Sequence, residues 1–238
     1  MKKNNWHKLF NKKNFGYNTK SKKVSLRPYD LTKVIFINLT RKRFKKITFF
    51  FQKKINLKKK ENLLDFGSGN GSFLLYFQKK AKKLYSIEIS KPLINFQRKF
   101  LKRTKFISAN PNDVNFFKKI KNNEVDITIA NSVFQYFKSE KYCKDVLTEM
   151  IRVTKKVIFI YDIKDKSKQR LYFDNAKKKQ NLTLKEFKKK YKLTPLRCYN
   201  KLFFKEFISS KFPKKKVRFF DLPKAQEDNK FGYCLKIS

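Results

Sequence analysis

Residues 39–56 carry apolar side chains at the spacing of a helix, with Lys and Arg between them. The apolar positions are Leu39, Phe44, Ile47, Phe50 or Phe51, and Ile55. A period near 3.6 residues predicts an amphipathic helix. We expect the apolar face of this helix to pack on the core of the domain.

Between Glu61 and Ile163, short apolar runs alternate with helix-like stretches. The strand-like runs cover residues 62–66, 83–89, 105–109, 123–131 and 155–163. The helix-like stretches cover residues 72–81, 92–103 and 139–154, and Pro92 suits a first helical turn. Strands that alternate with helices predict βαβ units, a parallel sheet and right-handed crossovers.

After Ile163 this alternation stops. Residues 164–193 are polar and Lys-rich, with weak helical character. A helix is predicted at 202–212, and strands at 215–222 and 230–238. A short polar link joins these two strands, so we expect them to pair antiparallel. A length of 238 residues and a hydrophobic content of 40% are enough for one domain with a sizeable core.

Three of the five glycines of the chain fall between the first strand and the first helix, in the stretch LLDFGSGNGS. They are Gly67, Gly69 and Gly71, and Asp65 precedes them in the strand. Glycine permits positive φ and lets a ligand touch the backbone, while the start of the helix offers free N–H groups. A strand, a glycine-rich turn and a helix are together typical of a cradle for a nucleotide-like ligand.

Two classes of ligand use such a cradle, and the spacing favours one of them. Dinucleotide binders prefer G-x-G-x-x-G, whereas Ser72 stands at the position of the third glycine here. Asp65 favours a cationic ligand over a pyrophosphate, because an acid just before the turn would face the ligand. Glu88, near the end of the second strand, can take both hydroxyls of a ribose, a contact that both classes use.

These elements together resemble the class I S-adenosylmethionine-dependent methyltransferases, with a domain similar to methyltransferase types 11, 12 and 25. LLDFGSGNGS resembles the glycine motif, SIEIS the segment with the ribose-binding acid, and SANPNDVNF the segment after the third strand. VDITIANSVFQYF resembles the fourth-strand motif, and VLTEMIRVTKKVIFIYDI the helix and strand that follow it. The resemblance covers about residues 60–163, with an antiparallel end at 214–238. It implies a doubly wound, Rossmann-like α/β fold with a seven-stranded, mostly parallel sheet, an antiparallel C-terminal strand and helices on both faces.

The resemblance also implies S-adenosyl-L-methionine as the cofactor and assigns its contacts. Asp65 would shape the site near the amino group of the cofactor, Glu88 would hold the ribose hydroxyls, and Ile89 would pack on the adenine. Asn131, at the end of the fourth strand, would face the methionine part or the substrate. The turn residues that would bind the cofactor, with the glycines around its methionine part, are Gly67, Ser68, Gly69 and Gly71.

One departure from the family pattern concerns the adenine. Asn110 stands where members commonly carry Asp after the third strand. It remains a candidate cofactor contact, and Asn112 and Asp113 are the substitutes for the missing acid.

A second departure concerns the catalytic base. Many members carry His where this chain has Gln135 and Tyr136, and its only histidine, His7, is too remote in sequence to assign. An amine or carboxylate acceptor needs little beyond alignment with the activated methyl group. A hydroxyl acceptor needs proton removal, for which Tyr136, Tyr161 and Asp162 are candidates, although we expect packing or pocket-lining roles first.

The formal net charge of +44 has two explanations. An AT-rich genome encodes Lys, Asn, Ile and Phe by default, and all four are plentiful here. Alternatively, a basic surface binds nucleic acid or an anionic membrane. Arg is the preferred residue for bidentate phosphate contacts, and its scarcity beside Lys favours the codon-bias explanation.

The remaining composition points away from metals and membranes. Cys143, Cys198 and Cys234 lie far apart without a CxxC pair, which indicates reduced thiols. With one histidine in the chain, we expect no metal site. No apolar run approaches a membrane span or a signal peptide, so we predict a cytoplasmic protein. Loose membrane contact through the basic N-terminus is an alternative, and the sequence does not indicate an oligomeric state.

We therefore predict a basic arm at residues 1–28 and a single methyltransferase domain at 29–238. Within the domain, we expect a cofactor-binding core at about 60–163, a lid or substrate insertion at about 164–200, and closing antiparallel strands at about 214–238. The predicted reaction is methyl transfer to a small molecule or a cell-surface precursor such as a sugar.

Two other functions remain open. An RNA methyltransferase would use the Lys-rich surface, but ANSVF stands where enzymes that methylate base amino groups carry an N/D-P-P-Y/F tetrapeptide. A non-catalytic binding protein of the same fold is disfavoured by the intact glycines and Glu88.

Overall fold

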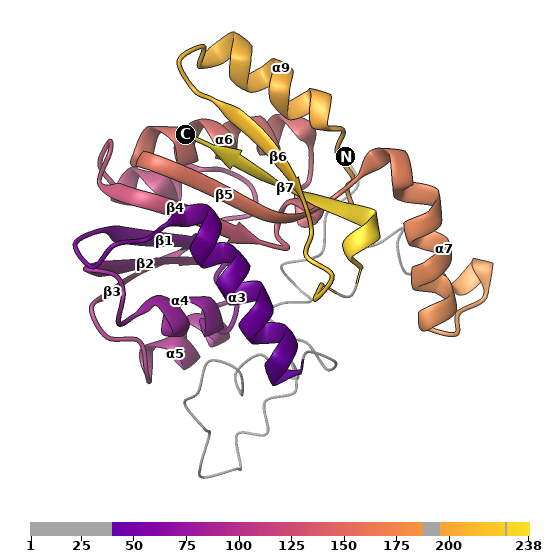
Figure 1. Ribbon diagram of the computed structural model, residues 1–238, viewed down its shortest axis with the longest axis horizontal. Coiled ribbons are helices and arrows are strands. Elements are labelled where there is room, and N and C mark those ends of the chain that lie inside the picture. The colour runs from indigo at the N-terminus through magenta and orange to yellow at the C-terminus, as the bar shows by residue number, and fades with distance from the viewer. Residues whose placement is uncertain (1–39, 188–195, 227) are drawn as a thin grey trace.

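The computed structural model describes residues 40–187, 196–226 and 228–238. The predicted arm at 1–28 and Leu39 lie outside these residues. The described part is one twisted sheet with helices on both of its faces (Figure 1). None of its helices combines the length and the apolar character that crossing a bilayer requires.

Seven strands form the sheet in the order β3-β2-β1-β4-β5-β7-β6. They are β1 Asn62–Phe66, β2 Lys83–Glu88, β3 Thr104–Ser108, β4 Val125–Asn131, β5 Thr154–Lys164, β6 Val217–Asp221 and β7 Gly232–Ile237. The first five strands are parallel, and β7 runs antiparallel to both β5 and β6. The predicted α/β fold, with its mostly parallel sheet and antiparallel C-terminal strand, is confirmed.

The strand order reverses between β1 and β4, which both lie at the centre of the sheet. In open parallel sheets, ligands bind beyond the carboxyl ends of the strands at such a reversal. The turn after β1 and the turn after β4 therefore meet where a ligand is expected.

The helices divide between the two faces of the sheet (Figure 1). On one face, α3 Arg41–Ile55, α4 Ser72–Phe77 and α5 Lys91–Arg98 pack over the side chains of Leu63 and Phe159. On the other face, α6 Glu140–Val153 and α9 Lys201–Lys211 pack over strand residues such as Leu64 and Ile160. Alternate strand residues thus feed two separate apolar clusters, as the period of a strand requires.

The ends of α3 follow from local hydrogen bonding. The side chain of Thr40 accepts a hydrogen bond from the backbone N–H of Arg43 at 3.3 Å, which caps the helix N-terminus. Asn56 ends the helix in the left-handed conformation. The buried face of α3 includes Phe44, Ile47, Phe51 and Ile55, so the predicted amphipathic helix is confirmed.

Two helices are shorter than the sequence predicts. The apolar pattern predicts helices at 72–81 and 92–103, whereas α4 ends at Phe77 and α5 ends at Arg98. Each helix must end early because the chain turns back into the next strand. The side chain of Gln78 accepts a hydrogen bond from the N–H of Lys102 and so ties the two turns together.

The Lys-rich segment after β5 contains a short 3-10 turn, η3 Lys166–Lys168, and α7 Gln169–Lys179. No residue of α7 is fully buried, and the helix projects from the edge of the domain (Figure 1). The Tyr172 ring contacts the Phe231 ring at 5.8 Å between centroids, and Lys179 pairs with Asp228 at 3.0 Å. These side chains join α7 to the segment that precedes β7.

We predict that Phe51→Ala lowers the free energy of unfolding by about 3–5 kcal/mol. Phe51 is 0% exposed and its ring lies 4.8–5.2 Å from those of Phe73, Phe159 and Tyr161. Phe49 on the same helix is 57% exposed, so Phe49→Ala is the matched control and should change stability little. Urea denaturation measures both variants. Equal losses in the two variants would contradict the assigned packing face of α3.

Candidate cofactor site

The turn from β1 to α4 depends on three left-handed glycines. Gly67, Gly69 and Gly71 have φ values of 72°, 57° and 78°, a region that other residues rarely adopt. A Cβ on Gly67 would lie 2.5 Å from a side-chain carbon of Val133, and a Cβ on Gly71 would lie 2.9 Å from a side-chain carbon of Gln97. Two of the glycines are thus required by packing of the turn against its neighbours as well as by backbone conformation.

A buried polar network holds the same turn from beneath. The hydroxyls of Ser68 and Ser86 lie 2.8 Å apart, and the Ser86 hydroxyl donates to the Gln97 side chain at 2.7 Å. The Gln97 amide donates to the hydroxyl of Ser68 at 2.9 Å and to the backbone carbonyl of Gly69 at 2.6 Å. The side chain of Ser68, a predicted cofactor contact, is therefore engaged inside the protein, and its backbone is the part left near the turn.

Glu88 closes the turn from the neighbouring strand. Its two carboxylate oxygens accept hydrogen bonds from the N–H of Gly69 at 2.7 Å and from the N–H of Ser90 at 2.8 Å. Burial raises the pKa of Glu88 to about 7, although these backbone donors oppose the shift. The carboxylate is consequently fixed at the carboxyl edge of β2, with further lone pairs that can accept from a ligand.

Asp65 is the least satisfied charged group of the site. Its side chain is 2% exposed, and its Oδ1 atom has no hydrogen-bond partner among the described residues. Burial, and secondarily the charge of Glu88, raise the pKa of Asp65 to about 8. A buried carboxylate oxygen without a partner is costly, and a cationic ligand would remove that cost.

The predicted adenine contacts lie at the ends of β2 and β3. Ile89 is half-buried directly after Glu88. Asn110 is exposed, its side-chain amide donates to the carboxylate of Asp113, and its Oδ1 accepts from the N–H of Asn112 at 3.0 Å. Asn110, Asn112 and Asp113 therefore form one small hydrogen-bonded loop.

The loop after β4 completes the carboxyl edge. Asn131 ends β4 and is half-buried, and the backbone of Ser132 that follows has a φ of 55°. Tyr136 lies in η2 Phe134–Tyr136 and is also half-buried. The neighbouring Gln135 is buried, and its Oε1 has no hydrogen-bond partner within the described part of the chain.

The other two candidate bases differ in their surroundings. Tyr161 is 1% exposed, packs on Phe51 of α3 and donates its hydroxyl to Gln226 at 3.1 Å. Burial raises its pKa far above the ordinary tyrosine value, so the phenolate is disfavoured. Asp162 is buried beside Lys164, whose ammonium lies 2.8 Å from its Oδ1.

Sequence reasoning missed three features of this edge. Gln97 carries the network under the glycine turn, Lys164 pairs with Asp162, and the Arg197 side chain donates to the carbonyls of Phe137 and Lys138. Each contact joins residues from different elements, which a linear pattern does not reveal. The polar residues near the C-terminal end of α5 and at the end of β5 were the available signals.

The geometry and the comparisons agree on one family. A family model described as a methyltransferase domain matches residues 64–160, from β1 to β5. Residues 64–160 are a class I S-adenosylmethionine-dependent methyltransferase domain. S-adenosyl-L-methionine is accordingly the cofactor of this domain. Among the residues that the structure describes, no group of His, Cys, Asp and Glu is arranged to hold a metal ion.

Solved structures share the fold of this methyltransferase domain. A SAM-dependent methyltransferase from Aquifex aeolicus is 18% identical with a TM-score of 0.53, over 88% of this chain and 96% of that chain. Magnesium protoporphyrin IX methyltransferase from Synechocystis PCC 6803, solved with bound SAH, is 10% identical with a TM-score of 0.56, over 82% of this chain and 81% of that chain. Geranyl diphosphate C-methyltransferase from Streptomyces coelicolor A3(2) is 11% identical with a TM-score of 0.55, over 81% of this chain and 74% of that chain. No curated protein sequence matches the chain significantly.

We predict that the ligand-free protein becomes less stable between pH 5.5 and 8.5. The native state raises the pKa of Asp65 to about 8 and that of Glu88 to about 7, whereas the unfolded chain has ordinary values near 4. The native state therefore retains protons that the unfolded chain has released, and stability falls as the pH rises through this range. Counting both groups, we expect a loss of roughly 5 kcal/mol by urea denaturation.

Few other groups titrate in this range, because the chain has one histidine and the thiols of its three cysteines begin to ionise only at the upper end. A double variant, Asp65→Asn with Glu88→Gln, removes both titrations and should show a nearly flat profile. Unchanged stability of the wild type at pH 5.5 and pH 8.5 would contradict the buried, partly protonated state of this pair.

Proposed function

We propose that the domain binds S-adenosylmethionine across the glycine turn and transfers its methyl group to a small molecule. The observation that carries this proposal is the buried Asp65 carboxylate, whose Oδ1 lacks a partner among the described residues. An ammonium group is a fitting partner for it, because a charge-assisted hydrogen bond would satisfy the buried acid. The cofactor has such a group on its methionine part.

The other contacts follow from the same edge of the sheet. We assign the ribose hydroxyls to Glu88, and the adenine to Ile89 and to the loop that begins at Asn110. Gly67, Ser68, Gly69 and Gly71 would bind the methionine part through their backbone, and Asn131 would face it from β4. This assignment is supported by the position of each residue at a carboxyl end of a strand or in the turn that follows.

When bound, S-adenosylmethionine supplies a methyl group that is already activated on a positively charged sulfur. The protein then has to hold the acceptor in line with that methyl group and keep water away. We do not assign proton transfer to Tyr161, because it is buried under α3 and its pKa is raised. Tyr136 remains a candidate because it is half-buried in the loop after β4.

The segment after β5 is proposed to form the acceptor side. The backbone N–H of Arg197 donates to the carbonyl of Gln135 at 2.8 Å, and the Tyr199 hydroxyl donates to the carbonyl of Phe134 at 3.2 Å. These bonds hold residues 196–199 against the loop after β4, whose Val133 contacts the glycine turn. The segment is therefore close enough to the site to cover an acceptor.

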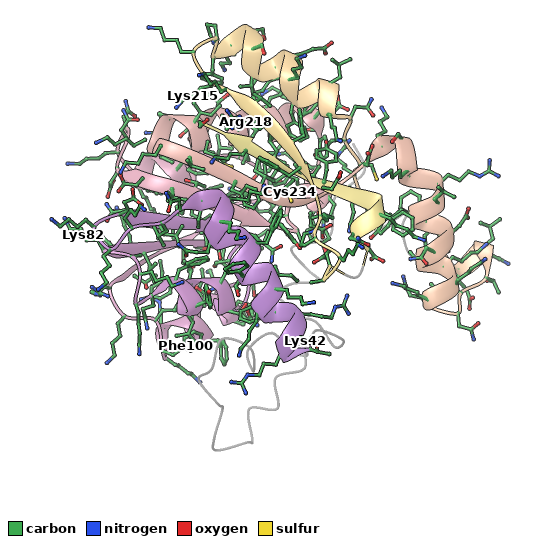
Figure 2. All side chains as sticks on the ribbon, in the orientation of Figure 1. Lys42, Lys82, Phe100, Lys215, Arg218 and Cys234 are labelled. Atoms are coloured by element: carbon green, nitrogen blue, oxygen red, sulfur yellow. The ribbon has the colours of Figure 1, made fainter. Side chains whose placement is uncertain are left out.

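A small molecule is favoured over RNA by two observations. Two of the structures with the same fold are named for small acceptors, magnesium protoporphyrin IX and geranyl diphosphate. In this chain, exposed Lys42 and Lys82 lie at separate edges of the molecule, on α3 and before β2 (Figure 2). These two lysines therefore do not line a common groove for a nucleic-acid backbone.

We predict that Glu88→Ala weakens S-adenosylmethionine binding by about 1.5–3 kcal/mol, because it removes charge-assisted hydrogen bonds. Glu206→Ala is the matched control, since Glu206 is exposed on α9, and it should bind normally. Isothermal titration calorimetry measures both variants. Unchanged affinity in a folded Glu88→Ala protein, or tight binding of NADH to the wild type, would contradict the assigned cradle.

We also predict where the methyl group goes. With methyl-tritiated S-adenosylmethionine and a fractionated cell extract, label should enter the small-molecule fraction. Label in the RNA fraction alone would overturn the small-molecule assignment and favour an RNA methyltransferase. Weak RNA binding that falls with salt and shows no sequence preference is the expected behaviour of a diffuse lysine surface.

A further inference from the structure

Two strained residues lie near the carboxyl ends of the neighbouring strands β4 and β5. Ser132 follows β4 with a φ of 55°, and Asp162 lies within β5 with a φ of 61°. The other described non-glycine residues with positive φ are Asn56, Arg103, Asn123 and Asn181, and each lies in a turn between elements or at the end of a helix. A left-handed residue inside a strand needs a separate cause, and such strain gathers at functional sites.

The two strained residues hold each other's side chains. The Ser132 hydroxyl donates to Oδ2 of Asp162 at 2.7 Å. The other carboxylate oxygen, Oδ1, lies 2.8 Å from the ammonium of Lys164. The side chains of Asp162 and Lys164 are each 5% exposed, so this is a buried ion pair with a serine attached to it.

The fold makes room for this arrangement. The pairing of β5 with β7 is irregular between Ile160 and Ile163, which is where Asp162 departs from the strand conformation. A Cβ on Gly232 of β7 would lie 2.7 Å from the carbonyl oxygen of Ile163 and 3.3 Å from Oδ1 of Asp162. Irregularities of this kind re-aim side chains and are common beside active sites.

The serine lies next to the cofactor turn. Val133, the residue after Ser132, fills the space where Gly67 would carry a side chain. Ser132 itself is half-buried rather than buried, and its hydroxyl lies 3.2 Å from Oδ1 of Asn131. The residue thus lies at the carboxyl edge of β4 beside the cofactor turn, and the shorter of its two hydrogen bonds is the one to Asp162.

Stability alone is a weak explanation for this cluster. A buried ion pair is often no more stabilising than an apolar pair of the same size, because both charges lose their water. Two left-handed non-glycine residues add a further cost. The cluster is therefore better explained by a task at the site than by the folding of the sheet.

We propose that Ser132 relays a proton from the methyl acceptor to Asp162, and that Lys164 positions the Asp162 carboxylate for this task. The inference rests on the proposed methyl transfer and narrows the acceptor to one whose nucleophilic atom carries a proton, a hydroxyl or an amine. The acceptor proton moves to Ser132 Oγ as the serine proton moves to Asp162 Oδ2. The freed lone pair of the acceptor forms the bond to the methyl carbon, and the electrons of the broken C–S bond stay on sulfur.

The decisive variant is Ser132→Gly. Glycine removes the hydroxyl and also relieves the left-handed strain, so the variant should fold at least as well as the wild type. Asn56→Gly is the matched control, because it relieves the same kind of strain at the end of α3, away from the site. A second variant, Asp162→Asn with Lys164→Met, removes both buried charges together and so leaves neither one unpaired.

Methyl-tritiated S-adenosylmethionine and the small-molecule fraction of a cell extract are the probes. We expect Ser132→Gly to lower turnover at least about 100-fold, the lower end of the range for acid–base groups, and the double variant to do the same. The calorimetric dissociation constant of S-adenosylmethionine and the melting temperature should be unchanged, and Asn56→Gly should keep full turnover. The label should survive treatment with base, because ethers and methylamines survive it whereas methyl esters release methanol.

Each result bears on a separate claim. Full turnover by Ser132→Gly, or label that base releases as methanol, would contradict the proton transfer while leaving methyl transfer in place. Loss of turnover together with loss of cofactor binding or melting temperature would mean a structural role and would also contradict it. No transfer by the wild type into small molecules would contradict the proposed function itself.

Discussion

The Asp65 carboxylate, taken out of water at the end of β1, is the constraint on which the site depends. Its burial is enforced by the central position of β1 between β2 and β4, with helices over both faces of the sheet. Burial and the nearby Glu88 raise its pKa to about 8, so the empty site carries an unfavourable charge or an extra proton. A cationic ligand removes both disadvantages.

The other parts of the site keep that turn in one conformation. Glu88 binds the backbone N–H of Gly69, and Gln97 binds its carbonyl, so both polar groups of the central glycine are fixed from neighbouring elements. Val133 packs where Gly67 lacks a side chain. The glycine turn and the loop after β4 are thus one packed unit. A conformational change in the loop after β4 should therefore also alter the glycine turn.

The sequence predicted the order of strands and helices well because that order depends on local periodicity. The burial of β1 could be read from its short apolar run, and the amphipathic face of α3 from the helical spacing of its apolar residues. The early ends of α4 and α5 could not, because they depend on where the chain must turn to reach the next strand. The glycines, Asp65 and Glu88 were recognisable by their spacing, whereas the pairing of Asp162 with Lys164 and Ser132 depends on left-handed backbone at two positions that carry ordinary side chains.

The central claim is that Asp65 recognises the amino group of the cofactor. The most direct measurement compares calorimetric binding of S-adenosylmethionine with that of an analogue that lacks only this amino group. The account predicts that the analogue binds the wild type about 10–100-fold more weakly, the scale of a hydrogen bond between charged groups. It also predicts that the affinities of the two ligands differ less for Asp65→Asn, which lacks the charge, than for the wild type. Equal affinity of the wild type for the two ligands would contradict the account.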